Sequence, residues 1–286
     1  PLPKATPTSR RLPWGRWSVR AAALSYLALM LIIPLLVIFQ DGLSQGLAGL
    51  WQAVNQPVAR AALLLTLRTS AIMVLINTGM GTLTAYVLVR YEFPGKSVLN
   101  ALVDLPLAIP TLVTGVMLVI LYGPQQPIGA WLESTLGWRI IFAPPGIVLA
   151  LLFVTFPFVV RAVQPVLLSL DRTVEDAAAT LGAGPWTIFR RVTLPPLILP
   201  LTTGALLSFA RAIGEFGSII IVAGNIPLRS QTAAVYVWGE VESENRFGAS
   251  AVSVALLALA FTLILVVDVL QSRREAAQSR QQKGGK

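Results

Sequence analysis

The stretch that decides the fold is residues 176–195, which read DAAATLGAGPWTIFRRVTLP. This polar island lies between two long apolar stretches, near 146–168 and 197–223. It carries its own helix-forming and helix-stopping residues. A short polar segment between two membrane-length segments is a place where a soluble partner can hold a membrane domain. The island therefore indicates a membrane-spanning chain with a candidate docking loop; the alternative is an ordinary linker helix at the membrane interface.

Composition supports a lipid environment. The chain has 286 residues, of which 55% are hydrophobic and 12% charged, and its mean hydropathy is +0.72. Soluble domains carry about 25% charged residues. There is no Cys and no His, which excludes disulfides, thiolate nucleophiles, imidazole bases and His-ligated metals. We therefore expect no metal site, and no catalytic residue that acts through a thiol or an imidazole.

Six apolar segments are long enough to cross a bilayer, which takes about 20 residues. Backbone polar groups in lipid are satisfied only by helices or a closed barrel, and continuous apolar runs favour helices. We predict an all-α membrane protein with six transmembrane helices. The expected spans are Ala21–Phe39, Ala61–Val89, Val98–Tyr122, Gly146–Leu168, Leu197–Ala223 and Phe247–Val267.

The Lys and Arg residues set the orientation, because cytoplasmic segments of membrane proteins are enriched in them. With an inside N-terminus, fifteen fall on the cytoplasmic side, four fall outside, and Arg68, Arg161 and Arg211 lie within spans. Both termini are therefore expected to be cytoplasmic. The net charge of +9 is a topology signal, and we expect no nucleic-acid partner. No small-residue cleavage site follows Phe39, so the first span is expected to be retained rather than removed as a signal peptide.

The predicted organisation has three parts. Residues 1–20 form a basic cytoplasmic tail, residues 21–270 form the six-span domain, and residues 271–286 form a polar cytoplasmic tail. The docking loop occupies residues 171–196. The external loops offer candidate docking surfaces for an outside partner, or alternatively interfacial anchors and solvated charge. These residues are Trp131, Trp138, Glu240, Glu242 and Glu244.

The docking loop is expected to contain two short helices. Thr173 and Asp176 form a capping-box pattern, which predicts a helix over Val174–Leu181 that ends at Gly182. Such a short helix must be stabilised by packing. Gly184-Pro185 begins a second helix with an apolar stripe of Trp186, Phe189 and Val192, and Leu194-Pro195-Pro196 is expected to stop it.

The spacing of this loop resembles the membrane subunits of bacterial ABC importers. Their pattern is Glu-Ala-Ala, three residues, Gly, nine residues, Ile, one residue, Leu-Pro. Here Asp replaces Glu and Val replaces Ile, which preserves charge and apolar character. The resemblance implies that the loop inserts a coupling helix into a cleft of an ATPase subunit. The implied coupling residues are Glu175, Asp176, Ala177, Ala178, Gly182, Val192, Leu194 and Pro195.

Further segments resemble the sulfate/molybdate branch of these importers, most closely its T-type sulfate/thiosulfate permease subunits. They are residues 91–96, 104–106, 158–166, 210–217 and 223–225. The resemblance implies a type I ABC importer permease fold in the bacterial inner membrane, with lipid around it. It implies two ATPase subunits, a second permease chain (a W-type homologue or a copy of this chain) and an extracytoplasmic sulfate-binding protein. It also implies that this chain is not an enzyme and holds no cofactor, with ATP bound by the partner subunits. Gly95-Lys96-Ser97 lacks the Gly that a phosphate-binding loop needs at position 90, which is Arg.

Charges inside the spans are candidates for the translocation pathway. Arg211 and Glu215 are spaced i, i+4 and are expected on one helix face, with Ser208 nearby. They form either a mutual ion pair or a pathway-facing pair in which Arg211 attracts a divalent oxyanion. Arg68 and Arg161 are expected to snorkel or pair. Prolines at 106, 110, 157 and 165 are expected to kink or break the third and fourth spans.

The sequence leaves alternatives open. The transported anion is sulfate, thiosulfate, molybdate or tungstate. A secondary anion transporter would give no reason for the spaced docking loop. An intramembrane enzyme is disfavoured, because His, Cys and a Gly-x-Ser-x-Gly elbow are absent from the sequence.

Overall fold

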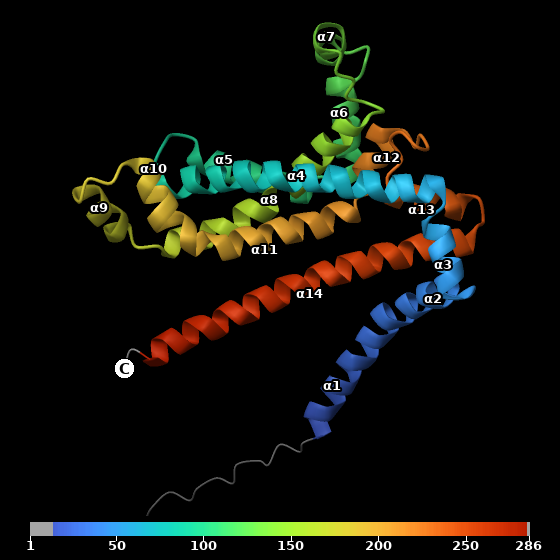
Figure 1. Ribbon diagram of the computed structural model, residues 1–286, viewed down its shortest axis with the longest axis horizontal. Helices are drawn as coiled ribbons and strands as arrows, with labels where there is room; N and C mark the ends of the chain where they lie inside the picture. Colours follow the sequence, from blue (N-terminus) through green and yellow to red (C-terminus); the bar gives the residue numbers. More distant parts are fainter. Residues whose placement is uncertain (1–13, 285–286) are drawn as a thin grey trace, which may run out of the picture.

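The computed structural model describes residues 14–284, with side-chain surroundings for 17–266 and 269, and all regular elements in this part of the chain are helices (Figure 1). The basic tail predicted for 1–20 lies largely outside the described residues. The elements are α1 Trp14–Leu27, η1 Ala28–Ile32, α2 Ile33–Gly42, α3 Gly46–Val54, α4 Pro57–Arg90, α5 Lys96–Ala108, α6 Thr111–Tyr122, α7 Pro127–Leu136, α8 Pro144–Ser169, α9 Arg172–Thr180, α10 Pro185–Ile188, η2 Phe189–Thr193, α11 Leu194–Ile213, α12 Gly217–Ala223, α13 Ala233–Glu242 and α14 Arg246–Gly284.

Helices α4, α8 and α11 form the centre of the bundle, with α5 against α8. Small residues let these helices approach closely. A Cβ added at Gly204 of α11 would lie 2.9 Å from the Cα of Val159 in α8, and one at Gly81 of α4 would lie 3.0 Å from its Cβ. Val159 and Val160 are fully buried between their neighbours. The bundle therefore depends on small-residue packing, as lipid-embedded helices do.

Within the described residues, five helical segments are long and apolar enough to cross a membrane, and a sixth candidate is a bent pair. The third span predicted for 98–122 is broken, because α5 and α6 meet at an angle of 110°. The break follows Ala108, and Pro110 precedes the first residue of α6. Proline lacks the amide hydrogen that would continue the helix, so the expected break is confirmed at Pro110. In contrast, α8 continues as one helix through Pro157 and Pro165.

The fifth span is also discontinuous, which corrects the single helix predicted for 197–223. Helix α11 ends at Ile213 and α12 begins at Gly217. The two breaks meet, because α12 packs against α6. A Cβ on Gly217 would lie 2.2 Å from the Oγ1 of Thr111, and one on Gly115 would lie 2.8 Å from the carbonyl oxygen of Ser218. Glycine at both positions permits this contact.

The N-terminal span behaves differently from the others. Helices α1 and α2, joined through η1, extend away from the bundle (Figure 1), and the most apolar part of the span Trp17–Gly42 has no buried residue. Helix α2 packs against α14, and at its end a Cβ on Gly42 would lie 2.9 Å from Val254. At the other end of the chain, α14 continues to Gly284, so most of the polar tail predicted at 271–286 extends this helix.

Candidate functional site

The first helix of the docking loop is α9, and its cap differs from the prediction. Asp171, rather than Thr173, is the N-cap, and its side chain accepts a 2.9 Å hydrogen bond from the backbone amide of Thr173. This bond lowers the pKa of Asp171 below its usual value, because it stabilises the carboxylate. The helix therefore begins two residues earlier than expected, at Arg172, and the capping-box assignment is wrong.

The C-terminal end of α9 is as expected. Gly182 has a φ of +83°, the left-handed conformation that glycine adopts most readily. Its amide donates to the Ala179 carbonyl over 2.9 Å, and the Ala183 amide donates to the Ala178 carbonyl over 3.1 Å. These bonds satisfy carbonyls that the helix end leaves open. Gly182 therefore defines where the helix ends.

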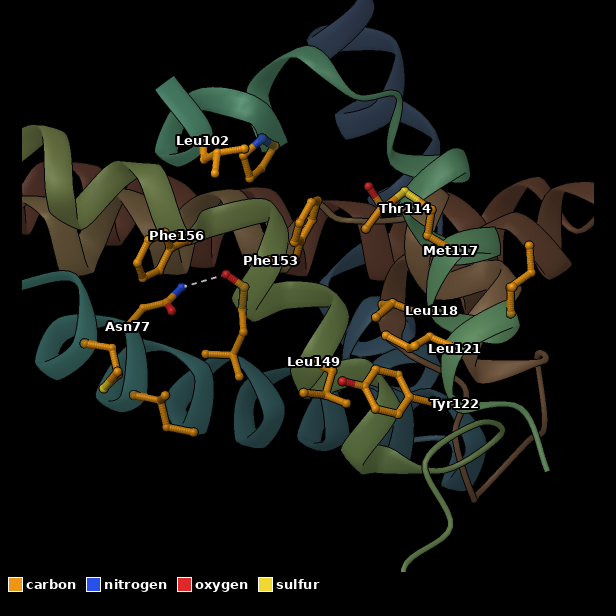
Figure 2. Close-up of a pocket in the computed structure, with 15 residues that line it drawn as sticks. Asn77, Leu102, Thr114, Met117, Leu118, Leu121, Tyr122, Leu149, Phe153 and Phe156 are labelled. Atoms are coloured by element: carbon orange, nitrogen blue, oxygen red, sulfur yellow. Dashed lines mark hydrogen bonds between the residues drawn. The ribbon is translucent and has the colours of Figure 1, made fainter. Parts of the chain in front are cut away.

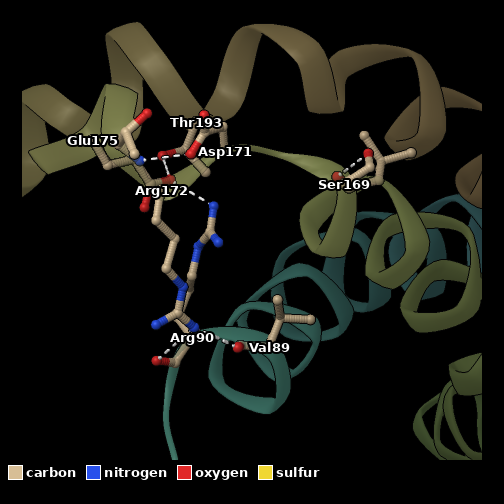
Figure 3. A network of polar contacts seen from close by, with 9 residues as sticks. Val89, Arg90, Ser169, Asp171, Arg172, Glu175 and Thr193 are labelled. Atoms are coloured by element: carbon tan, nitrogen blue, oxygen red, sulfur yellow. Dashed lines mark hydrogen bonds and ion pairs between the residues drawn. The ribbon is translucent and has the colours of Figure 1, made fainter.

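Glu175 ties α9 to two other elements (Figure 3). Its Oε1 lies 2.8 Å from the guanidinium of Arg90 at the end of α4, and it accepts a 2.8 Å hydrogen bond from the Thr193 hydroxyl in η2. The side chains of Arg90 and Glu175 are only 7% and 16% exposed. Arg172 adds a 2.9 Å bond to the Val89 carbonyl. The sequence motif missed this role of Glu175, since Arg90 lies 85 residues away.

The remaining surface of α9 is open. Leu181 is 89% exposed and Val174 55%, and the helix has no buried residue. Among the predicted coupling residues, Asp176, Ala177, Gly182 and Pro195 are exposed, whereas Glu175, Ala178, Val192 and Leu194 are partly buried. A nine-residue helix with exposed apolar side chains is not self-sufficient.

The second helix of the loop is continuous with the following span. Helix α10 passes through the π-helical turn η2 into α11, so Leu194-Pro195-Pro196 does not stop it. Pro195 and Pro196 directly follow the π-helical turn, and local π-helical adjustments of this kind let a membrane helix tolerate residues that lack an amide hydrogen. Phe189 stacks on Trp186, with ring centroids 5.7 Å apart, and contacts Tyr86 of α4 edge-on at 5.9 Å. Aromatic packing therefore adds to the Glu175 contacts between loop and bundle.

The second cluster of predicted residues lies at the break between α11 and α12. Arg211 and Glu215 are not on one continuous helix, yet their side chains form a 2.7 Å ion pair. Glu215 also accepts 2.9 Å hydrogen bonds from the backbone amide and the hydroxyl of Ser218. The sequence analysis did not identify Ser218 as a partner. Ser208 is fully buried, and its hydroxyl lies 3.5 Å from the Thr155 carbonyl of α8.

Arg161 pairs as expected, in a cluster that joins α8 to α5. Its Nε lies 2.7 Å from Asp104 Oδ1, and its two terminal nitrogens contact Asp104, Asn100 and Gln164. Asn100 and Asp104 are spaced i, i+4, and Arg161 and Gln164 i, i+3, so each pair shares a helix face. Arg68 is exposed and makes no ion pair with a described residue.

A cavity of about 800 Å³ lies between α4, α5, α6 and α8 (Figure 2). Its walls are mostly apolar and include Leu102, Met117 and Phe153. The side chain of Asn77 is turned toward Thr155 of α8, 2.9 Å away. Such walls offer a small anion no charge, so we place no oxyanion contact here.

Comparison with solved structures defines the class of protein. The chain superposes on a bacterial alginate ABC transporter in complex with its periplasmic protein, with a TM-score of 0.75 and 16% identity, covering 91% of this chain and 95% of the other. The methionine ABC transporter MetNI gives a TM-score of 0.54 at 17% identity, covering 75% and 94%. These matches show the fold of an ABC importer permease.

The sequence comparisons are more specific. Residues 77–276 match the family described as "Binding-protein-dependent transport system inner membrane component", and the chain belongs to this family of inner-membrane permeases. It is 40% identical over 264 residues to "Probable sulfate transport system permease protein cysT" of Chlorokybus atmophyticus, covering 92% of this chain and 90% of the relative. It is 38% identical to "Sulfate transport system permease protein CysT" of Synechocystis, covering 91% and 88%.

Proposed function

We propose that this chain is the permease subunit of an ATP-driven importer for sulfate and thiosulfate. The observation that carries the proposal is the exposed, capped helix α9 with the spacing of a coupling loop, in a chain similar to sulfate permeases over about nine-tenths of its length. Molybdate and tungstate are tetrahedral dianions of the same shape and are the alternative substrates.

The proposed partners follow from the surfaces that the bundle leaves open. Two ATPase subunits supply the energy, one of them docking on α9. A second permease chain, either a W-type homologue or a copy of this one, packs beside the bundle and covers the extended α1–α2 segment. An extracytoplasmic binding protein delivers the anion. This chain needs no cofactor and performs no catalysis in the proposal, because ATP binds to the ATPase subunits.

In the proposed mechanism, ATP-driven closure of the ATPases moves α9. Glu175 passes this movement directly to α4 through Arg90 and to η2 through Thr193. Because η2 is continuous with α11, the same displacement reaches the broken fifth span. The spans then reorient around a central pathway, and the anion is released on the cytoplasmic side.

The partners are tested by gentle solubilisation of native membranes and mass spectrometry of what co-purifies with the C-terminally tagged chain. We expect an ATPase, a second permease and a sulfate-binding protein. A molybdate-binding protein instead would change the substrate and keep the mechanism. Recovery of the chain alone in several mild detergents, together with ATP-independent uptake, would replace the proposal with a secondary transporter.

Docking is tested by Gly182→Pro. The φ of +83° is outside the range of proline, so the variant should insert in the membrane but lose ATP-driven uptake. Gly46→Pro is a matched control, because Gly46 also has a positive φ of +70° with nothing within 4 Å of an added Cβ, and it lies outside the docking loop. Full uptake by Gly182→Pro would overturn docking through α9.

A further inference from the structure

The arginines within the spans differ in how fully their donors are used. Contacts from all three guanidinium nitrogens of Arg161 account for its five donors. Arg211 makes one such contact within the described residues, from one terminal nitrogen to Glu215, and its side chain remains 36% exposed. Arg68 lies on an exposed apolar stripe of α4 with Leu64 and Ile72. Arg211 is therefore the paired arginine that retains donors for a ligand.

Glu215 fixes the orientation of the Arg211 side chain. The Glu215 side chain is 1% exposed. One carboxylate oxygen is held by the amide and hydroxyl of Ser218, each at 2.9 Å, and the other faces Arg211 at 2.7 Å. Because the carboxylate is buried and held at both oxygens, it directs one edge of the guanidinium inward. The remaining N–H donors of Arg211 are available on the exposed side of its guanidinium.

This ion pair lies where the two broken spans meet. Gly217 contacts Thr111 at the start of α6, and Ser218, which holds Glu215, contacts Gly115. Irregular backbone at membrane depth occurs where it is buried in protein or lines a cavity, and discontinuous helices form substrate sites in many transporters. Arg211 follows Arg191 by twenty residues, which is about 30 Å of helix. A helix of that length crosses the hydrocarbon core, so Arg211 lies near the edge of the core opposite Arg191.

We propose that Arg211 is the oxyanion contact at the outer end of the pathway, and that Glu215 and Ser218 are positioning residues that orient it. The proposal rests on the proposed function. A guanidinium edge presents two parallel N–H donors that match two oxygens of a tetrahedral dianion. Glu215 keeps the net charge of the site at zero before the anion arrives. Binding is therefore weak, and the anion leaves readily.

The test uses the purified transporter reconstituted in liposomes. Arg211→Gln should lower ATP-driven sulfate uptake by about tenfold or more, since a charged hydrogen-bonded contact is lost, and Arg211→Lys should lower it less. Glu215→Gln keeps an acceptor for Ser218 but leaves Arg211 unneutralised. It should increase radiolabelled sulfate bound by the complex without its binding protein by about tenfold, while uptake falls because release slows.

Arg68→Gln is the control, because it removes an intramembrane arginine that has no ion pair with a described residue, and it should change uptake less than about twofold. The double variant Arg211→Gln with Glu215→Gln removes both charges, so neither is left unpaired. It should assemble even if a single variant does not, and should fail to take up sulfate.

Wild-type uptake by Arg211→Gln or by the assembled double variant would overturn the proposal, and so would unchanged sulfate binding in Glu215→Gln. Failure of the proposed function would give a different result in the same assay. In that case the unmodified transporter itself would show no ATP-dependent sulfate uptake.

Discussion

Removal of the Glu175 carboxylate should uncouple ATP hydrolysis from transport. In Glu175→Ala, the Arg90 guanidinium loses its ion pair while its side chain stays 7% exposed, and its Nε already lacks a partner among the described residues. The Thr193 hydroxyl, in a residue only 1% exposed, loses its acceptor as well. The variant therefore leaves two buried donors unsatisfied at once.

The magnitude follows from these contacts. Breaking a buried pair by removing one partner costs about 3–5 kcal/mol. Glu175 is 16% exposed, so water partly compensates, and we expect about 2–3 kcal/mol for the attachment of α9 to α4. That corresponds to roughly a 30- to 150-fold shift toward a detached loop. Glu175→Gln retains an acceptor for Thr193 and should cost less, because only the charge is lost.

The assay is the number of ATP molecules hydrolysed per anion imported by the reconstituted transporter. We expect this ratio to rise severalfold in Glu175→Ala, because the ATPase then moves a loop that no longer pulls on α4. Glu92→Gln is the matched control. It also removes a carboxylate paired with a basic residue, but Glu92 is 85% exposed, and such surface pairs are worth about 0.2–1 kcal/mol. An unchanged ratio in Glu175→Ala, with the complex intact, would refute this role for Glu175.

Three further outcomes are expected. Gly217→Ala places a Cβ 2.2 Å from Thr111 Oγ1, which should cost about 1–3 kcal/mol of stability and lower the Tm of the purified complex. Gly79→Ala is the control, because a Cβ there has nothing within 4 Å, and it should leave the Tm unchanged. Arg161→Met leaves the Asp104 carboxylate, which is 49% exposed, without its cation and should destabilise the complex by about 1 kcal/mol, measured as a lower midpoint of thermal aggregation. Arg161→Met with Asp104→Leu should recover most of the loss. Tyr236 is buried and its phenol donates a hydrogen bond to the Glu240 carboxylate, and together these raise the pKa of Tyr236 from 10.0 to about 12. The folded state therefore favours the neutral phenol, and stability present below pH 10 is lost as the pH rises toward 12. Tyr236→Phe should remove that component of a Tm-versus-pH profile.

The sequence predicted those features that depend on local composition. Apolar length identified the membrane segments, because lipid accepts only helices whose backbone is satisfied internally. Gly182 was predicted to end α9 because its role depends on its own φ. The spacing of the docking loop led to the family, since each motif position lies within a few residues of the next. Pro110 was expected to interrupt its span for the same local reason.

The features that were missed depend on contacts across the chain. The cap is the exception: Asp171 and Thr173 are both local candidates, and the backbone conformation at the start of α9 decides that Asp171 reaches the free amide. The partner of Glu175 lies in another helix, and no local pattern points to Arg90. The break after Ile213 is the clearest case. No proline marks it, and the Arg211–Glu215 spacing is equally suitable for a continuous helix. The break is instead stabilised by tertiary contacts, in which Ser218 holds Glu215 and glycines let α12 contact α6.

Locally encoded features and features that depend on distant contacts occur both in the docking loop and in the broken spans. The spacing and the C-terminal end of the docking loop are encoded locally, whereas its attachment to the bundle depends on the distant pair of Glu175 and Arg90. The break in the third span is encoded by Pro110, whereas the break in the fifth span depends on contacts between α6 and α12. In the proposed mechanism, a displacement of α9 would reach α11 through Glu175, Thr193 and the continuous η2 turn. The break at residues 214–216 is the first place along that route where the backbone leaves the helix. A movement that begins at the ATPase can therefore be absorbed beside Arg211, where we place the anion.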